Sequence, residues 1–266
     1  MTDLGYTADE IMTVAAARQL RDNMVCFVGI GMPSAAANLA RLSHAPEVVL
    51  IYESGTIGAK PDVLPLSIAD GELSETALSV VSVPEMFRYW LQGGRIDVGF
   101  LGAAQIDRFA NINTTIIGDY RKPTTRLPGG GGAPEIATSA REIFVMLRMS
   151  PRAFVAKLDF VTSLGHGSGG ASRAAAGAQG RGPTRIVTDL GILSPDPESR
   201  ELELASIHPG ISVEQAKAAC GWPLRIAEGL AETPAPTEVE LATLRNFKSR
   251  SEAAGTGRPQ RAKAPS

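Results

Sequence analysis

Short, continuously apolar runs recur along the chain and alternate with segments that have helical spacing. Strands that are apolar on both faces are typical of a parallel sheet covered by helices on both sides. The runs that predict strands are 24–28, 48–52, 98–102, 142–147, 160–162 and 185–188. The segments that predict helices are 7–20, 34–40, 84–91 and 134–140. The alternation therefore predicts a three-layer α/β/α fold with a mostly parallel central sheet.

The first of these helices carries a start signal of its own. Thr7 is a good N-cap residue, and Glu10 stands three residues later, as a capping box requires. Residues 164–183 are rich in Gly, Ala and Ser and predict a long surface loop. From residue 248 the composition is too polar to bury a core. We therefore expect one folded domain at 1–247 and a disordered tail at 248–266.

Composition excludes several classes of partner. The net charge is −2 and aromatic residues make up 5% of the chain, so neither a basic groove nor stacking platforms for nucleic acid are expected. No apolar stretch is long enough to span a bilayer, and the N-terminus does not resemble a signal peptide. The two cysteines form no framework, which favours the reducing cytoplasm. The three histidines show no hydrolase pattern and no metal-ligand spacing.

A glycine turn, Gly29-Ile30-Gly31, follows the first predicted strand. It allows a dinucleotide fingerprint in which Glu53 binds the ribose, but Pro33 interrupts the turn and Ser34 replaces the third glycine. A helix N-terminus facing an anionic substrate group is an alternative. A tight turn without a ligand is equally compatible with the sequence.

The second predicted strand ends in Tyr52-Glu53-Ser54-Gly55. Ligands of open α/β sheets bind at the carboxyl ends of the strands, so a glutamate there can act as a nucleophile or a base. An exposed loop glutamate is the alternative. No His or Asp pair with ligand spacing lies nearby, so a metal site is not expected.

Two further segments offer backbone rather than side chains to a ligand. Gly129, Gly130, Gly131 and Gly132 precede Ala133 and a predicted helix, and no Walker lysine follows them. Such a loop lets N–H groups point at a developing oxyanion. The run Gly102-Ala103-Ala104-Gln105 ends the strand at 98–102 with small residues and one amide, which suits the close passage of a long ligand.

Together these segments resemble the class I coenzyme A transferases, over residues 7–245. Within that family the similarity is greatest to the β subunits of the group that acts on glutaconate and 3-oxoadipate. The residues that carry the resemblance are Tyr52–Gly55, Gly58–Pro61, Leu64–Ile68, Arg88–Asp97, Leu101–Asp107, Asn111–Thr115, Ile117–Tyr120 and Gly129–Ala133.

The resemblance implies a covalent nucleophile at Glu53 and an oxyanion or substrate loop at 129–133. It also implies that CoA is transferred from succinyl-CoA to a dicarboxylate, for which 3-oxoadipate is the first expectation and glutaconate an alternative. An acyl-CoA hydrolase on the same fold, or a subunit that only completes a site on its partner, are further alternatives. The implied CoA-binding or substrate-binding residues are Gly29, Gly31, Ser54, Gly102, Ala103 and Gln105.

The resemblance further implies an α-subunit partner in an α2β2 assembly. It requires no metal and no bound cofactor, since the CoA thioester is itself a substrate. One departure is visible, because the family often has Gly-Asn where this chain has Ala110-Asn111. A glycine would suit a positive φ that alanine tolerates poorly, so the departure concerns the local turn.

Overall fold

A computed structural model describes residues 5–257 of the chain. Within these residues ten strands form one sheet in the order β14-β13-β12-β11-β10-β5-β1-β2-β3-β4. Its strands are β1 (Val25–Val28), β2 (Val49–Tyr52), β3 (Thr56–Ile57), β4 (Ser79–Val80), β5 (Val98–Leu101), β10 (Glu142–Met146), β11 (Pro183–Val187), β12 (Gly191–Pro195), β13 (Leu202–Ile207) and β14 (Arg225–Glu232). Two small antiparallel pairs accompany it, β6 (Gln105–Ile106) with β7 (Ile112–Asn113) and β8 (Ile116–Gly118) with β9 (Pro123–Arg126).

The centre of the sheet is parallel and its margins are mostly antiparallel. The neighbours β11, β10, β5, β1 and β2 all run in the same direction. Strands β12 and β3 reverse that direction on the two sides. The α/β fold and the mostly parallel sheet predicted from the apolar runs are therefore confirmed. Parallel strands place all their carboxyl ends at one edge, which fixes where loops can meet.

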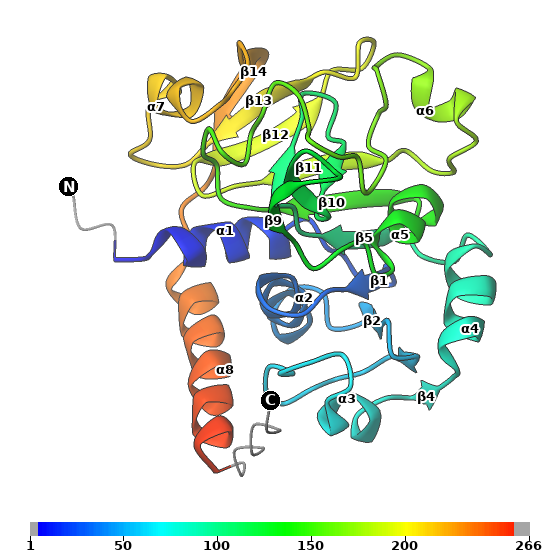
Figure 1. Cartoon of the computed structure of the whole chain (residues 1–266). Helices are drawn as coiled ribbons and strands as arrows, with labels where there is room; N and C mark the ends of the chain where they lie inside the picture. Colours follow the sequence, from blue (N-terminus) through cyan, green and yellow to red (C-terminus); the bar gives the residue numbers. More distant parts are fainter. Residues whose placement is uncertain (1–4, 258–266) are drawn as a thin grey trace.

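Helices cover both faces of the sheet (Figure 1). The helical segments are α1 (Ala8–Ala17), α2 (Met32–Leu42), α3 (Gly71–Glu75), α4 (Val83–Glu85), η1 (Met86–Leu91), α5 (Ala133–Ser139), α6 (Ser172–Ala175), α7 (Val213–Ala218) and α8 (Glu238–Gly257). Helices α1, α2 and α8 share one core with Cys26 and Val28 of β1. Phe27, on the opposite face of the same strand, packs in a second core with η1 and α5. Alternation along β1 thus separates two apolar cores, as a three-layer fold requires.

The local signals at the helix starts are realised. Thr7 caps α1, and Glu10 completes the capping box with the Thr7 N–H at 2.8 Å. Helix α2 begins after Gly31, whose φ of 87° lies in the region that favours glycine, and Pro33 occupies the first turn. The predicted helix at 84–91 is a short α-helical turn that continues as the π-helix η1.

Three sequence predictions need correction. Residues 160–162 form no strand. The next residue, Ser163, makes an isolated β-bridge with Ile112. The segment 164–183 is not simply a surface loop, since it contains α6 and buries His166 and Arg173. The predicted disordered tail is wrong for 248–257, which continue α8; the Leu64 N–H donates to Ser251 Oγ there at 2.6 Å. The predicted disorder of 258–266 lies outside the described residues.

Candidate active site

Three candidate segments meet at the carboxyl edge of the parallel strands. Gly29 follows β1, Glu53 follows β2 and Gly102 follows β5. Strand β1 lies between β5 and β2, so the three segments stand on neighbouring strands about 5 Å apart. The position that a Cβ would take at Gly29 is 3.9 Å from the Phe100 carbonyl oxygen of β5. The sheet topology therefore brings together segments that are distant in sequence.

Glu53 projects from a turn that requires glycine. The Gly55 N–H donates to the Tyr52 carbonyl at 3.0 Å, and the Val81 N–H donates to the Gly55 carbonyl at 2.9 Å. Gly55 has φ of 102°, and a Cβ there would stand 1.9 Å from the Val81 carbonyl oxygen. Ser54 Oγ is buried and makes no hydrogen bond within the described chain. The turn holds Glu53 half-buried at the end of the strand, beside a hydroxyl that has no protein partner.

The glycine loop closes over this carboxylate. A Cβ added at Gly132 would lie 2.8 Å from Glu53 Oε1 and 2.7 Å from Phe87 Cζ. Gly132 thus lets the backbone approach the carboxylate more closely than any other residue could. Phe87 belongs to η1 and meets Phe27 edge-on, with ring centroids 6.2 Å apart. π-helical turns are frequent at functional sites, and here one supplies an apolar wall beside Glu53.

The loop is fixed at Gly129 and at the start of α5, where the Ile136 N–H donates to the Gly132 carbonyl at 3.0 Å. Gly129 N–H donates to the Thr114 carbonyl, and Thr114 Oγ1 donates to the Gly129 carbonyl, both at 2.8 Å. The N–H groups of Gly130, Gly131 and Gly132 make no hydrogen bond within residues 5–257. Anchored ends with unpaired central donors are the arrangement that an oxyanion site needs.

The segment 160–163 supports the same loop from the side. Thr162 Oγ1 accepts the Thr114 N–H at 2.9 Å and lies 2.7 Å from Thr115 Oγ1. A Cβ at Gly130 would stand 3.3 Å from Thr162 Cγ2. Residues 160–162, which were predicted to form a strand, therefore pack against the loop and support it. Nothing in the local sequence of Thr162 or Phe87 marks these contacts, because both depend on chain segments brought together by folding.

A buried polar network lies behind Glu53. The Tyr52 hydroxyl is 3.0 Å from Ser34 Oγ and 3.4 Å from Asn38 Nδ2, and all three residues are fully buried. Arg41 Nε donates to Asn38 Oδ1 at 3.0 Å. Burial raises the pKa of the Tyr52 hydroxyl, although its hydrogen bonds to Ser34 and Asn38 act in the opposite direction. The network joins β2 to α2 and fixes the strand end that carries the glutamate.

The remaining predicted binding residues differ in what they offer. Gly102 is exposed, and Gly31 is exposed at the start of α2. Ala103 packs against the second core. Gln105 is buried, and its amide is engaged internally: Oε1 accepts from Asn113 Nδ2 at 2.7 Å and Nε2 donates to Asp159 at 3.0 Å. In this structure Gln105 therefore acts as a brace for the loops and offers no free group to a ligand.

Ala110 adopts the positive φ that the comparison with the family suggests. Its φ is 57°, and it is fully buried. Asp107 Oδ1 accepts the Asn111 N–H at 3.0 Å, and Asn111 Oδ1 accepts the Gly165 N–H at 2.9 Å. The turn is thus retained with alanine, because side-chain hydrogen bonds on both sides hold its backbone.

The described residues hold neither a metal cluster nor a membrane-spanning helix. Between residues 5 and 257 no group of three or more His, Cys, Asp or Glu side chains is placed to hold a metal ion. None of the helices in that range is both long enough and apolar enough to cross a membrane.

Comparison with known proteins shows the family of the chain. The family model for coenzyme A transferase matches residues 9–219. The chain is 63% identical over 249 residues to the B subunit of the 3-oxoadipate CoA-transferase of Pseudomonas knackmussii. The aligned residues cover 94% of this chain and 96% of that protein. It is 35% identical over 245 residues to the B subunit of the glutaconate CoA-transferase of Acidaminococcus fermentans, covering 89% and 91%. The crystal structure of glutaconate coenzyme A-transferase from that organism superposes with a TM-score of 0.87 at 32% identity, covering 93% and 96%.

The chain belongs to the coenzyme A transferase family. The resemblance seen in the sequence is confirmed, and so is the fold that it implied. Within the family, the chain is similar to the two B subunits named above, and its identity to the Pseudomonas knackmussii chain is the higher of the two.

Proposed function

We propose that this chain is the catalytic β subunit of a cytoplasmic CoA-transferase that moves CoA from succinyl-CoA to 3-oxoadipate. The observation that carries the proposal is the approach of the glycine loop to Glu53, with 2.8 Å between Glu53 Oε1 and the Cβ position at Gly132. The 63% identity to a chain of a 3-oxoadipate CoA-transferase supports the choice of acceptor. That choice would place the enzyme in the catabolism of aromatic compounds.

Glu53 would act as a covalent nucleophile. Its carboxylate attacks the thioester carbonyl of succinyl-CoA, and collapse of the tetrahedral intermediate expels CoA thiolate and leaves a mixed anhydride. The thiolate then attacks the Glu53 carbonyl, which releases succinate and leaves a glutamyl-CoA thioester. The carboxylate of the acceptor attacks this thioester, and the same steps run in reverse. No net thioester energy is lost, provided that water is kept out.

Each of these steps develops negative charge on a carbonyl oxygen. The unpaired N–H groups of Gly130, Gly131 and Gly132 stand beside Glu53 and are suited to receive it. Removing one oxyanion donor typically lowers the rate by ~10²–10³. Phe87 forms an apolar wall beside the Glu53 carboxylate. The Ser54 hydroxyl, which has no partner in the described chain, offers one further hydrogen bond to a bound substrate.

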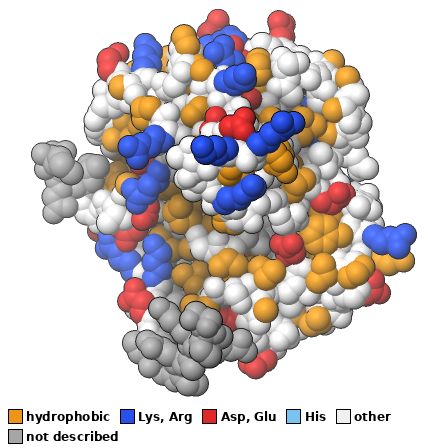
Figure 2. All heavy atoms as spheres, viewed as in Figure 1, with side chains coloured by type: hydrophobic (Ala, Val, Ile, Leu, Met, Phe, Trp, Pro, Cys, Tyr) orange, Lys and Arg blue, Asp and Glu red, His pale blue; other side chains and the backbone are white. Residues whose placement is uncertain are grey.

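The edge of the sheet next to Glu53 has room for the long pantetheine arm of a CoA thioester. Gly29, Gly31, Gly102 and Ala103 leave backbone and small side chains along the edge next to Glu53, where pantetheine would pass. Basic side chains gather where Figure 1 shows β9, above a hollow that contains hydrophobic side chains (Figure 2). The β8–β9 hairpin carries the exposed Arg121, Lys122 and Arg126. These cations could neutralise phosphate or carboxylate groups of the substrates.

We propose an α subunit as partner, in an α2β2 assembly. Large apolar side chains are exposed on the segments that flank the Glu53 turn, namely Leu66, Ile68, Leu78, Val80, Val83 and Tyr89. Exposed apolar patches of this kind mark protein–protein contacts. A subunit docked there would also shield the anhydride from water.

Peptide mass spectrometry of the complex with its α subunit tests the covalent step. Succinyl-CoA should leave a CoA adduct on the peptide that contains Glu53, and 3-oxoadipate should remove it. Glu53→Gln should form no adduct and lose transfer activity. Glu53→Asp withdraws the carboxylate by one methylene, and misplacement by about 1 Å can lower the rate ~10²-fold.

The outcomes separate the competing functions. An adduct that glutaconate removes and 3-oxoadipate does not would identify a glutaconate-type acceptor. Release of one succinate per active site accompanies the glutamyl-CoA thioester in any case, so only continued turnover to succinate and free CoA without an acceptor carboxylate would identify a hydrolase. Near-full activity of Glu53→Gln would refute the nucleophile and leave this chain as a scaffold for the α subunit.

A further inference from the structure

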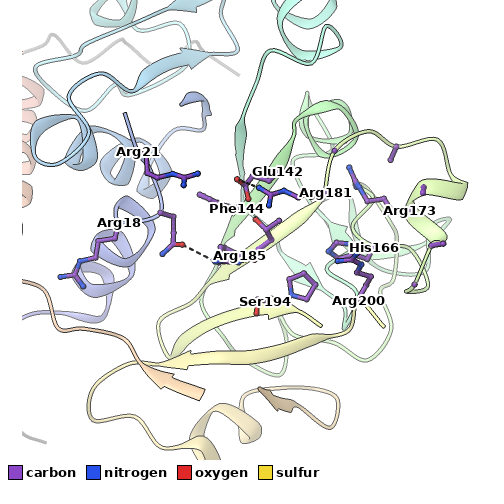
Figure 3. Close-up of a pocket in the computed structure, with 18 residues that line it drawn as sticks. Arg18, Arg21, Glu142, Phe144, His166, Arg173, Arg181, Arg185, Ser194 and Arg200 are labelled. Carbon is purple, nitrogen blue, oxygen red and sulfur yellow. Dashed lines mark hydrogen bonds and ion pairs between the residues drawn. The ribbon is translucent and has the colours of Figure 1, made fainter. Parts of the chain in front are cut away.

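A strongly basic cavity lies away from Glu53, which is not among its lining residues. It has a volume of about 830 Å³ and is lined by the beginnings of β10 and β11, the end of β12, the segment after α1 and the segment 166–181 that contains α6 (Figure 3). Strands β10 and β11 run parallel to β2. Their amino ends therefore lie at the sheet edge opposite the one that carries Glu53. The catalytic chemistry makes no use of this cavity.

The lining has far more positive than negative charge. Its arginines are Arg18, Arg21, Arg173, Arg181, Arg185 and Arg200, and its only carboxylate among the described residues is Glu142. Like charges gathered in one cavity repel one another more strongly than they would in open water. The arginines of such a set that have no acidic partner are stabilised when an anion enters the cavity.

Three of these arginines are already engaged. Arg18 binds Glu240 at 2.6 Å, outside the cavity's own lining. Arg181 pairs with Glu142 at 2.9 Å. Arg173 is 5% exposed and donates to four backbone carbonyls, which makes it a fixed cation in the wall.

The other three arginines have no acidic partner in the described chain. The side chains of Arg21 and Arg200 make no ion pair or hydrogen bond there. Arg185 is half-buried, and its Nε and Nη1 reach only neutral oxygens, of Gln19 at 3.3 Å and of the Thr184 backbone at 2.7 Å. Figure 3 shows Arg21 and Arg185 on one side of Glu142 and Arg181, with Arg200 near His166 and Arg173.

We propose that this cavity is a binding site for a small polyanion that carries phosphate or carboxylate groups. Guanidinium forks bind both groups bidentately, and Arg is weakly hydrated enough to do so inside a cavity. The volume lies within the range of small-molecule sites. Arg21, Arg185 and Arg200 supply the anion contacts, while Arg173 and Arg181 set the surrounding potential. The site is separate from the transfer reaction and does not rest on the proposed acceptor.

Calorimetric titration of the complex with its α subunit, in phosphate-free buffer at fixed ionic strength, tests the site. Pyrophosphate and citrate are the probes, and sodium acetate is the monoanion control. At least one probe should bind saturably to the wild type, and the tighter one identifies phosphate or carboxylate as the preferred group. Arg21→Gln and Arg185→Gln should each weaken binding about tenfold or more, as loss of a charged hydrogen bond does. Transfer activity should stay at the wild-type level.

Arg152→Gln is the matched control, because Arg152 is exposed and lies outside the cavity. This substitution removes the same charge as the two test substitutions. Arg21→Gln breaks no hydrogen bond or ion pair within the described chain, and an unchanged Tm would show that misfolding does not explain its effect. Equal weakening by Arg152→Gln would reduce the effect to general electrostatics and overturn the proposal. Unchanged binding in Arg21→Gln and Arg185→Gln would also overturn it. So would the absence of saturable binding by either probe, as expected if acidic side chains of the α subunit already fill the cavity.

Discussion

At the scale of single residues, the site depends on glycines at positions where a Cβ atom would clash with neighbouring atoms. Gly55 is fixed by its positive φ and by the Val81 carbonyl, so its role is conformational. Gly132 differs, because its φ of −81° is ordinary and only neighbouring side chains exclude a Cβ. Its glycine therefore serves the approach of the loop to Glu53 and not the backbone conformation.

Gly132→Ala should separate activity from folding. The added Cβ would meet the ends of two side chains, Glu53 Oε1 and Phe87 Cζ, which can move without disturbing the backbone. We expect kcat to fall about 10²-fold, because displacement of the nucleophile by about 1 Å costs that much, with little change in Tm. Gly229→Ala is the control, since no atom lies within 4 Å of its Cβ position. Unchanged kcat would show that the loop does not constrain the nucleophile.

Gly102→Ala tests the predicted path of the CoA thioester. Gly102 is exposed, and the nearest atom to its Cβ position is the Met146 carbonyl oxygen at 4.0 Å, so the fold has room for a methyl group. If pantetheine passes against the backbone there, the methyl should raise KM for succinyl-CoA about tenfold, as overpacking of a fitted site does. Steady-state kinetics measures this. A wild-type KM would remove Gly102 from the binding path.

At the scale of elements, α8 is fastened to α1 by two ion pairs. Arg245 binds Glu10 at 2.7 Å, and Arg18 binds Glu240 at 2.6 Å. Leu244 and Phe247 are buried beneath them. The helix therefore belongs to the folded domain, although its sequence after residue 248 is polar.

The two ion pairs predict an acid-sensitive helix. The hydrogen bond from Arg245 lowers the pKa of Glu10 to about 2. Burial raises the pKa of Glu240, but the bonds from Arg18 and Thr237 outweigh it and bring the value to about 2. Both values lie below the ordinary pKa of 4.5, so the stabilisation is present above about pH 4.5 and is lost as the pH falls toward 2.

Hydrogen exchange checks this expectation. After correction for the intrinsic rate, amides of α8 should lose more protection between pH 6 and pH 3 than amides of β1. Arg245→Gln should show part of that loss already at pH 6. Lys248→Gln is the control, because the Lys248 side chain lies on the same helix and makes no ion pair or hydrogen bond within the described residues. Protection of α8 that does not change with pH would contradict the role of the two pairs.

At the scale of the whole molecule, burial encloses the Cys26 thiol fully and the Cys220 thiol in part. Cys26 is fully buried in β1, and burial raises its pKa far above the ordinary value. Burial also raises the pKa of Cys220, to about 11, against smaller opposing contributions from Trp222 and Arg108. Since the thiolate is the reactive form, neither side chain is suited to nucleophilic or redox chemistry in the native state.

Thiol labelling followed by peptide mass spectrometry measures this protection. At pH 8 we expect slow labelling of both cysteine peptides in the native protein and complete labelling after unfolding. Labelling of Cys26 should follow opening of the sheet and so report global stability. Rapid native labelling of Cys26 would show that β1 opens locally, which the two-sided core argues against.

The sequence by itself determined the layered fold and the place of Glu53 at the end of a strand. Apolar runs, glycine turns and the Thr7–Glu10 capping box are local signals, because they depend on backbone conformation and on neighbours a few residues away. These signals indicated the strand end at Glu53 and the loop at 129–133, which the sheet topology then brought together.

Only the tertiary structure decided which side chains meet across long sequence separations. It engaged Gln105 with Asn113 and Asp159, set Thr162 against the glycine loop and held the polar end of α8 on the domain. It also gathered around one cavity arginines from the segment after α1, from α6 and the segment after it, from β11 and from the segment after β12. Such contacts arise from the packing of distant segments, and the composition of each segment alone does not specify its partner.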